Sequence, residues 1–338
     1  MPEPTTKSRS DLLRKITALL EVLGVLIAGN FVSGKLLSLL KIDPFGPLFR
    51  PTSTSSVPDF VAISFLWLKM ILVQYTCLFL PAFAIGWWRR HLRLPHYGVT
   101  TAGQPVWRLV GMGVILFALT AMPIKFLWIA KRFFALGPQP AFWALLDRNW
   151  TLSFWLFLAV SSFLVTPIFE ELFYRGYCQT RLEENFGGVG AIVIVALFMT
   201  FSHQQYQQMN ILSIGTIVSL IPIMVGLGYA YWRTRSLIPV VILHMIINLP
   251  TKGIYDFILP ALMASTLILF RKQWLGMARD FWREWSEKGW KTAAFLAALI
   301  AIILFVGYES QPGVFIVIGF LCLGSALWME YRAKRPSL

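Results

Sequence analysis

Long apolar runs recur along this chain, and they constrain its fold more than any other feature of the sequence. The first covers residues 16–34 and the second residues 60–88, and further runs follow as far as residue 329. About 20 predominantly apolar residues in a helix are enough to cross a bilayer. Because backbone polar groups within the hydrocarbon must find partners inside the protein, such segments form helices or closed barrels. The runs predict an all-α, polytopic transmembrane helical bundle of about ten spans.

Composition and charge agree with a membrane location. Hydrophobic residues make up 57% of the 338 residues, and charged residues only 14%. The net charge of +14 comes from clusters of Lys and Arg at the ends of the apolar runs, where the positive-inside rule expects them. This pattern argues against nucleic acid as a partner. It predicts an integral, multi-pass protein of the lipid bilayer with both termini in the cytoplasm.

The segment Pro167–Gly176 places two carboxylates and an arginine in otherwise apolar sequence. Ionisable residues inside a membrane segment are costly and usually mark a functional site. Residues four apart share a helix face, so Glu171 is expected to pair with Arg175. Glu170 points about 100° away and is left for another task, such as that of a general base. Pro167 removes a backbone donor, which predicts a kink just before the carboxylates.

Two later spans carry the other rare polar side chains. His203 closes the span 189–203, and His244 and Asn248 lie four residues apart in the span 237–249. An imidazole and a carboxamide on one helix face can both donate hydrogen bonds, as an oxyanion hole requires. A helix rises about 1.5 Å per residue, so the depth of each side chain in the membrane can be calculated from its distance along the chain to the nearest cytoplasmic flank. This depth is roughly 14 to 20 Å for Glu170, His203, His244 and Asn248. Their shared depth predicts a single site near the middle of the membrane.

A packing role is the alternative for each of these residues, because intramembrane Glu, His and Asn also link helices through hydrogen bonds. The common depth favours a functional site for the set. Two other acidic positions are expected to carry no function. Glu21 is placed near the membrane interface, and Glu183 and Glu184 are placed with Arg181 on a solvated face.

Taken together, the motifs resemble those of the CPBP family. They are Glu-Glu-x-x-x-Arg from Glu170, a histidine that closes the next span, and His-x-x-x-Asn from His244, in this order on successive helices. The family contains type II CAAX prenyl endopeptidases of the Ras-converting kind and bacterial relatives that include bacteriocin-immunity-like (Abi) proteins. The resemblance covers about residues 150–250. One position departs from it, because Met199 stands where the family motif Phe-x-x-x-His has Phe, a change that an apolar packing role tolerates.

The resemblance implies an intramembrane endopeptidase with an eight-helix core, followed here by two C-terminal spans. The residues carried over are Glu170 and His203 to activate a water, His244 and Asn248 as the oxyanion hole, and Glu171 with Arg175 as structural support. The chain is accordingly expected to divide into a cytoplasmic N-terminal segment (1–15), N-terminal spans (16–149), a CAAX-protease-like catalytic core (150–250) and C-terminal spans with an interfacial loop over 271–291 (251–338).

The implied reaction is hydrolysis of a peptide bond near the C-terminus or membrane segment of a peptide or membrane protein, prenylated or not, as in CAAX-box processing. A non-catalytic immunity or scaffold protein of the same family is the alternative. The family is often classed with the metalloendopeptidases, and Glu170, His203 and His244 offer a His-His-carboxylate set for Zn²⁺. The sequence has no His-Glu-x-x-His motif. We favour a reaction that requires no metal and keep zinc as the alternative.

Overall fold

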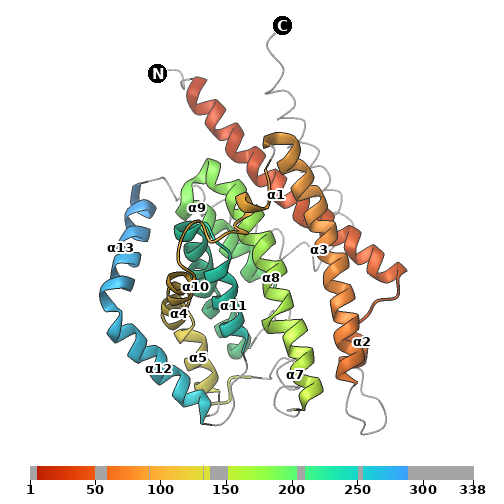
Figure 1. Ribbon diagram of the computed structural model, residues 1–338, viewed down its shortest axis with the longest axis vertical. Helices are drawn as coiled ribbons and strands as arrows, with labels where there is room; N and C mark the ends of the chain where they lie inside the picture. Colours follow the sequence, from red (N-terminus) through yellow and green to blue (C-terminus); the bar gives the residue numbers. More distant parts are fainter. Residues whose placement is uncertain are drawn as a thin grey trace.

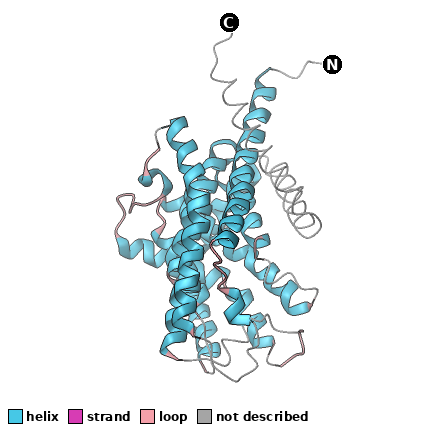
Figure 2. Ribbon diagram, turned by 90° about the vertical axis from the view of Figure 1, so that its right-hand side faces the viewer, coloured by secondary structure: helices cyan, strands magenta, loops and turns pink. Residues whose placement is uncertain are grey.

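The computed structural model shows a bundle of helices (Figures 1 and 2). It describes residues 6–49, 59–90, 92–131, 133–137, 151–203, 210–249 and 254–287. All regular elements within these ranges are helical, which confirms the all-α prediction. The two last predicted spans, 292–308 and 314–329, lie outside the described residues.

The helical elements follow one another along the chain, and two of them, η2 and η3, are π-helical. In chain order they are α1 (Thr6–Leu39), α2 (Phe45–Phe49), α3 (Phe60–Arg90), the 3-10 helix η1 (Leu94–Tyr97), α4 (Val106–Thr120), α5 (Met122–Ala130), α7 (Leu152–Leu158), η2 (Ala159–Phe163), α8 (Val165–Glu171), η3 (Leu172–Gln179), α9 (Thr180–Phe201), α10 (Ile211–Thr234), α11 (Ile238–Asn248), α12 (Tyr255–Leu269) and α13 (Arg271–Glu287).

Fewer helices than predicted are long and apolar enough to cross a bilayer alone. In the described ranges four stretches qualify, namely Leu13–Leu39, Phe60–Arg89, Leu152–Phe201 and Ile211–Thr234. The pair α4 and α5, bent by 45°, would be a fifth. The expected fourth and fifth spans both fall within Leu152–Phe201, where Gly187 (φ 72°) breaks the helix, and α11 and α12 are shorter than a full span. The count of about ten spans is therefore not confirmed.

The surface of the bundle is apolar over much of its length. Large hydrophobic side chains point outward along several helices, among them Leu72 and Leu80 on α3, Val218 on α10 and Leu262 and Ile268 on α12. Lipid tails are a suitable environment for such side chains, whereas water is not. With the long apolar helices, this surface identifies an integral membrane protein.

Helix α8 occupies a central place, between α11 on one side and α3 on the other (Figure 1). Helices α9 and α10 pack together, α4 packs on α11, and α1 packs on α3. The main core includes Phe173, Leu182 and Ile192, all fully buried. A smaller cluster joins α3 to α7 through Phe60 and Phe157. The sequence segment with the two carboxylates thus lies where several helices meet.

The predicted break just before the carboxylates is present. Leu164 has φ −121° and ψ −67°, and its N–H donates to the carbonyl of Ala159, five residues back, at 2.9 Å. The π-helical turn η2 ends here, and α8 begins at Val165 with Pro167 in its first turn. Single π-helical turns of this kind are frequent at functional sites. The break sets the direction in which α8 carries its carboxylates.

Candidate active site

Glu171 connects two helices through hydrogen bonds to both of its carboxylate oxygens. Arg175 Nε donates to Oε2 at 3.2 Å, one turn along the same helical stretch. His244 Nδ1, from α11, lies 2.6 Å from Oε1. The side chains of Glu171 and Arg175 are fully buried, and that of His244 is 5% exposed. The pairing with Arg175 agrees with the four-residue spacing, whereas the contact with His244 was not expected.

Glu170 approaches the opposite edge of the same imidazole. Its Oε2 lies 3.5 Å from His244 Nε2, and its side chain is 22% exposed, in contrast to the enclosed Glu171. A carboxylate only accepts hydrogen bonds, so the short contact at Nδ1 places a proton on that nitrogen. Nε2 is then the ring atom available for proton transfer. The two neighbouring carboxylates thus hold the His244 imidazole between them. The carboxylate of Glu171 is enclosed, and that of Glu170 is accessible.

Arg175 is buried among sulfur atoms and a backbone carbonyl. Its Nη2 donates to Met224 O at 3.2 Å and contacts Met199 Sδ at 3.4 Å. The Glu171 carboxylate is the counter-charge that makes this burial tolerable, since an isolated buried charge is strongly unfavourable. Met199, at the position where the family motif has Phe, therefore contacts the arginine of the site directly.

His203 lies at the end of α9 and is oriented by the backbone of the same helix. Its Nδ1 lies 2.6 Å from Met199 O, and because a carbonyl only accepts, Nδ1 carries the proton. A neutral His203 then has its lone pair on Nε2, where it can accept a proton. The ring also interacts electrostatically with His244 and Glu171. Met199 thus stands between His203, which contacts its carbonyl, and Arg175, which contacts its sulfur.

Asn248 makes a hydrogen bond that the sequence did not predict. Its Nδ2 donates to Ser162 O at 2.9 Å, in the π-helical turn η2. One N–H of the carboxamide is therefore used to join α11 to η2, because the π-helical turn exposes carbonyls that the α-helical pattern would satisfy. The structure brings Glu170, Glu171, Arg175 and His244 into contact, places His203 beside them through Met199, and places Asn248 at the turn that precedes them.

The alternative zinc ligands, Glu170, His203 and His244, are not gathered into one cluster in the part of the chain that the structure describes. Within the described ranges, no group of three His, Cys, Asp or Glu side chains is placed to hold a metal ion. The Nδ1 atoms of His244 and His203 contact Glu171 and a backbone carbonyl, which leaves the Nε2 atom of each ring as the one that could meet a ligand. We therefore derive no step of the reaction through a metal.

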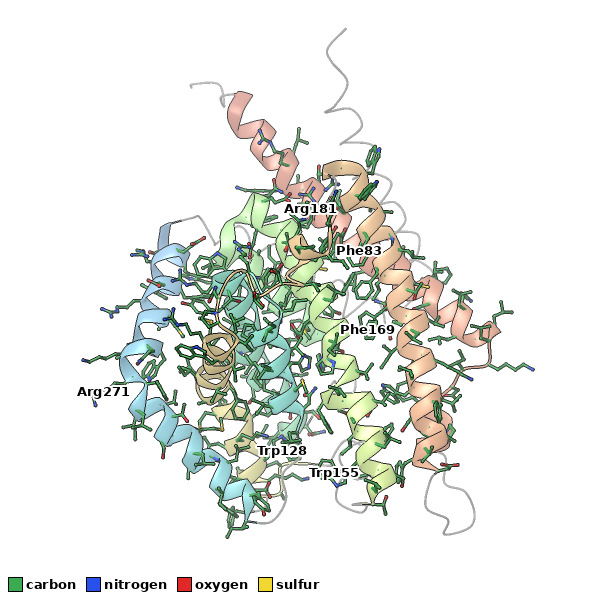
Figure 3. All side chains as sticks on the ribbon, in the orientation of Figure 1. Phe83, Trp128, Trp155, Phe169, Arg181 and Arg271 are labelled. Carbon is green, nitrogen blue, oxygen red and sulfur yellow. The ribbon has the colours of Figure 1, made fainter. Side chains whose placement is uncertain are left out.

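A second buried polar cluster, centred on Glu21, was missed by sequence reasoning. Glu21 is 1% exposed and accepts from Arg89 Nη2 at 2.5 Å and from Arg181 Nε at 2.7 Å. Its other oxygen accepts from the Tyr177 hydroxyl at 3.0 Å. The cluster lies toward the end of the bundle where α1 passes α9 and α3 ends, as the position of Arg181 in Figure 3 shows. The sequence did contain a signal for this cluster, because Glu21 is an acidic residue within an apolar run. The same kind of signal drew attention to Glu170.

The expected solvated face at residues 181–184 is corrected at Arg181 and Glu183. The side chain of Glu183 is only 9% exposed, pairs with Arg235 and accepts from Gln179 Nε2 at 2.9 Å. Arg181 is 10% exposed, and its Nη1 donates to Glu184 Oε2 at 3.0 Å. These charges face neighbouring helices because α10 and α1 both pack against α9. Arg181 and Glu183 are therefore placed by contacts between helices, whereas Glu184 is exposed as the sequence predicts.

Comparison with known proteins finds a family match for the central part of the chain. Residues 151–250 match the family model described as type II CAAX prenyl endopeptidase Rce1-like. We refer to the matched segment, residues 151–250, as the Rce1-like domain. The Rce1-like domain contains all six candidate side chains, namely Glu170, Glu171, Arg175, His203, His244 and Asn248. No curated protein and no solved structure matches the chain.

Proposed function

We propose that the chain is an intramembrane endopeptidase that hydrolyses a peptide bond near the C-terminus or membrane segment of its substrate. The observation that carries the proposal is the contact of two adjacent carboxylates with one imidazole in the Rce1-like domain. Packing alone does not require an accessible carboxylate next to a buried, charge-compensated one. Proton transfer does, because one group must exchange protons while the other holds its partner in place.

In the proposed reaction, Glu170 takes a proton from a water molecule while the water oxygen attacks the substrate carbonyl. The lone pair of His203 Nε2 helps to hold that water. His244, fixed by Glu171, relays the proton through Nε2, 3.5 Å from Glu170, to the departing amine as the C–N bond breaks. An imidazole oriented by a buried carboxylate performs the same task in serine proteases. The second N–H of Asn248, together with protonated His244, stabilises the oxyanion.

The test is Glu170→Gln in the purified full chain, reconstituted in liposomes. The assay uses a quenched fluorescent peptide that ends in a farnesylated CAAX box, beside the same peptide without the farnesyl group. The variant keeps the size of the side chain and removes the base, so we expect cleavage to fall by about 100-fold or more. Asp280→Asn is the control, because Asp280 lies on α13 and pairs with Arg233 and Arg283. Full activity of a folded Glu170→Gln variant would refute the scheme, and a folded wild type that cleaves neither peptide would favour the non-catalytic alternative.

Chelation tests the proposal that the reaction requires no metal. Each proton transfer above runs through a side chain, so incubation with EDTA or 1,10-phenanthroline is expected to leave the cleavage rate within about twofold of the untreated protein. Loss of activity that returns on addition of Zn²⁺ would contradict this expectation. It would assign zinc to the reaction in place of a water activated by side chains alone.

A further inference from the structure

A partly open cavity, here called the Tyr97 cavity, lies at the end of the bundle that Arg181 and Phe83 mark in Figure 3. Its walls include Arg89 from the last turn of α3, Tyr97 from η1, and Thr180 and Arg181 from the start of α9. The ring centroid of Tyr97 lies 4.9 Å from that of Phe83. The cavity has a volume of about 20 Å³, whereas a single water requires at least about 10–15 Å³. It therefore admits one or two small polar groups of a ligand, but not a whole organic molecule.

One polar group of the Tyr97 cavity, the Tyr97 hydroxyl, is buried without a hydrogen-bond partner among the residues that the structure describes. Tyr97 is only 2% exposed. Its hydroxyl lies against α3 at Gly86, where a Cβ would overlap it, so a glycine at this position gives the hydroxyl its room. Buried tyrosine hydroxyls nearly always find a partner, and a missing one points to a bound water or ligand.

Two guanidinium groups share the cavity wall with this hydroxyl. The side chains of Arg89 and Arg181 are 8% and 10% exposed, and both donate to Glu21 Oε2. Arg181 also donates to Glu184, so the carboxylates of the wall are engaged with these arginines. Guanidinium groups are hydrogen-bond donors only, and a phenol can donate as well. A ligand group rich in acceptors is the one that such a wall suits, and a phosphate is the strongest such group.

Basic and aromatic side chains around the Tyr97 cavity indicate where such a phosphate would come from. Arg14 and Lys15 lie on α1 in the two turns before it reaches the cavity, and Arg93 is the residue that precedes η1. Helix α3 ends here with Trp87 and Trp88, which are 56% and 51% exposed. Exposed tryptophans at the end of a membrane helix lie at the level of the lipid headgroups. Basic pockets between membrane helices at that level bind phosphate-bearing headgroups.

We propose that the Tyr97 cavity binds the headgroup phosphate of an anionic phospholipid, which accepts hydrogen bonds from the Tyr97 hydroxyl and from Arg89 and Arg181. The small volume admits only phosphate oxygens, so the rest of the lipid remains in the bilayer. None of these three residues belongs to the proposed catalytic set. The inference is therefore independent of the endopeptidase activity.

Tyr97→Phe tests the inference, because it removes only the hydroxyl and keeps the ring that packs on Phe83. Native mass spectrometry of the full chain in mild detergent is titrated with phosphatidylglycerol, phosphatidylcholine or inorganic phosphate, and the mass of the bound species identifies the ligand. We expect wild type to bind phosphatidylglycerol in preference to phosphatidylcholine. The Kd for phosphatidylglycerol should rise about tenfold or more in the variant, as when a hydrogen bond to a charged group is lost. Without lipid, the melting temperature should be unchanged or higher, because the deleted hydroxyl has no protein partner to lose.

Tyr229→Phe is the matched control. Tyr229 is a buried tyrosine on α10 whose ring packs on Trp232 and Phe281, and its change should leave the Kd within about twofold. Equal binding of phosphatidylglycerol by wild type and both variants would overturn the proposed site. Binding of inorganic phosphate without the lipid would assign the cavity to a free anion, and binding of neither would assign it to water, so both results contradict the proposal. A lower melting temperature of lipid-free Tyr97→Phe would show that the hydroxyl already has a partner in the protein, which contradicts it as well.

Discussion

Glu171 accepts from two side chains whose removal should have different consequences. Toward Arg175 it is the counter-charge of a guanidinium buried within the bundle. Toward His244 it fixes the orientation of the ring and the position of its proton. The first contact concerns stability, because an uncompensated charge in a low-dielectric interior is strongly unfavourable. The second concerns the reaction, because a carboxylate that orients a catalytic imidazole sets which nitrogen can transfer protons.

Glu171→Leu should separate these two contributions when it is combined with Arg175→Met. The single change leaves Arg175 buried without its partner, and we expect it to destabilise the protein by about 3–5 kcal/mol. The double change removes both charges and should recover most of that loss, yet remain inactive because His244 has no orienting carboxylate. Unfolding in mild detergent and peptide cleavage are the two measurements. A stable and active double variant would show that Glu171 has no part in orienting His244.

At the scale of elements, a close approach between η3 and η1 depends on a glycine. A Cβ placed on Gly176 would lie 2.7 Å from the carbonyl oxygen of Tyr97, which is backbone and cannot rotate away. The contact brings the stretch that carries Arg175 against the short helix that follows α3. Absence of a side chain at position 176 is therefore a condition for packing η3 this closely against η1.

Gly176→Ala is expected to lower the melting temperature and the cleavage rate together, because η1 must move away to admit the methyl group. Gly111→Ala is the control, since a Cβ at Gly111 in α4 meets no atom within 4 Å. That change should be neutral or stabilise the protein by up to about 1 kcal/mol, the difference in helix propensity between the two residues. Equal melting temperatures for the two variants would contradict the close approach.

At the scale of the whole molecule, the Glu21 cluster joins the N-terminal helix to the Rce1-like domain. Glu21 comes from α1, Arg89 from α3, and Tyr177 and Arg181 from the domain itself. Tyr75 makes a second connection, from α3 to Phe169 on α8. The Rce1-like domain is therefore packed as part of a larger bundle, against helices that precede residue 151.

Glu21→Leu should show this dependence. The change leaves Arg89 and Arg181 without a buried counter-charge, and we expect a loss of about 3–5 kcal/mol in unfolding free energy. Asp280→Asn is again the control, because Asp280 also pairs with two arginines but is 34% exposed, where ion pairs contribute about 0–1 kcal/mol. Similar stabilities of the two variants, measured in the same detergent, would indicate that the Glu21 cluster does not hold α1 on the domain.

Features that depend on residues close in sequence were predicted well. The pairing of Glu171 with Arg175 follows from the helical repeat, and the break at Leu164 follows from Pro167 and the local backbone. The apolar runs determine that the chain is helical and membrane-embedded, because the bilayer allows few other solutions. The motif order was sufficient to indicate the CPBP family, whose Rce1-like model matches residues 151–250.

Features that join distant residues required the tertiary structure. Depth along each helix placed Glu170 and His244 at a similar level. Only the rotation and packing of α8 against α11 decide that His244 contacts Glu171 and that Asn248 donates to Ser162. The partners of Glu21 likewise come from three other helical elements. A periodic pattern predicts which residues share a face of one helix. It does not predict which neighbouring helix packs against that face, or through which of its residues. The sequence by itself therefore determined the type of fold and the candidate residues, and the packing of the helices decided how those residues are paired.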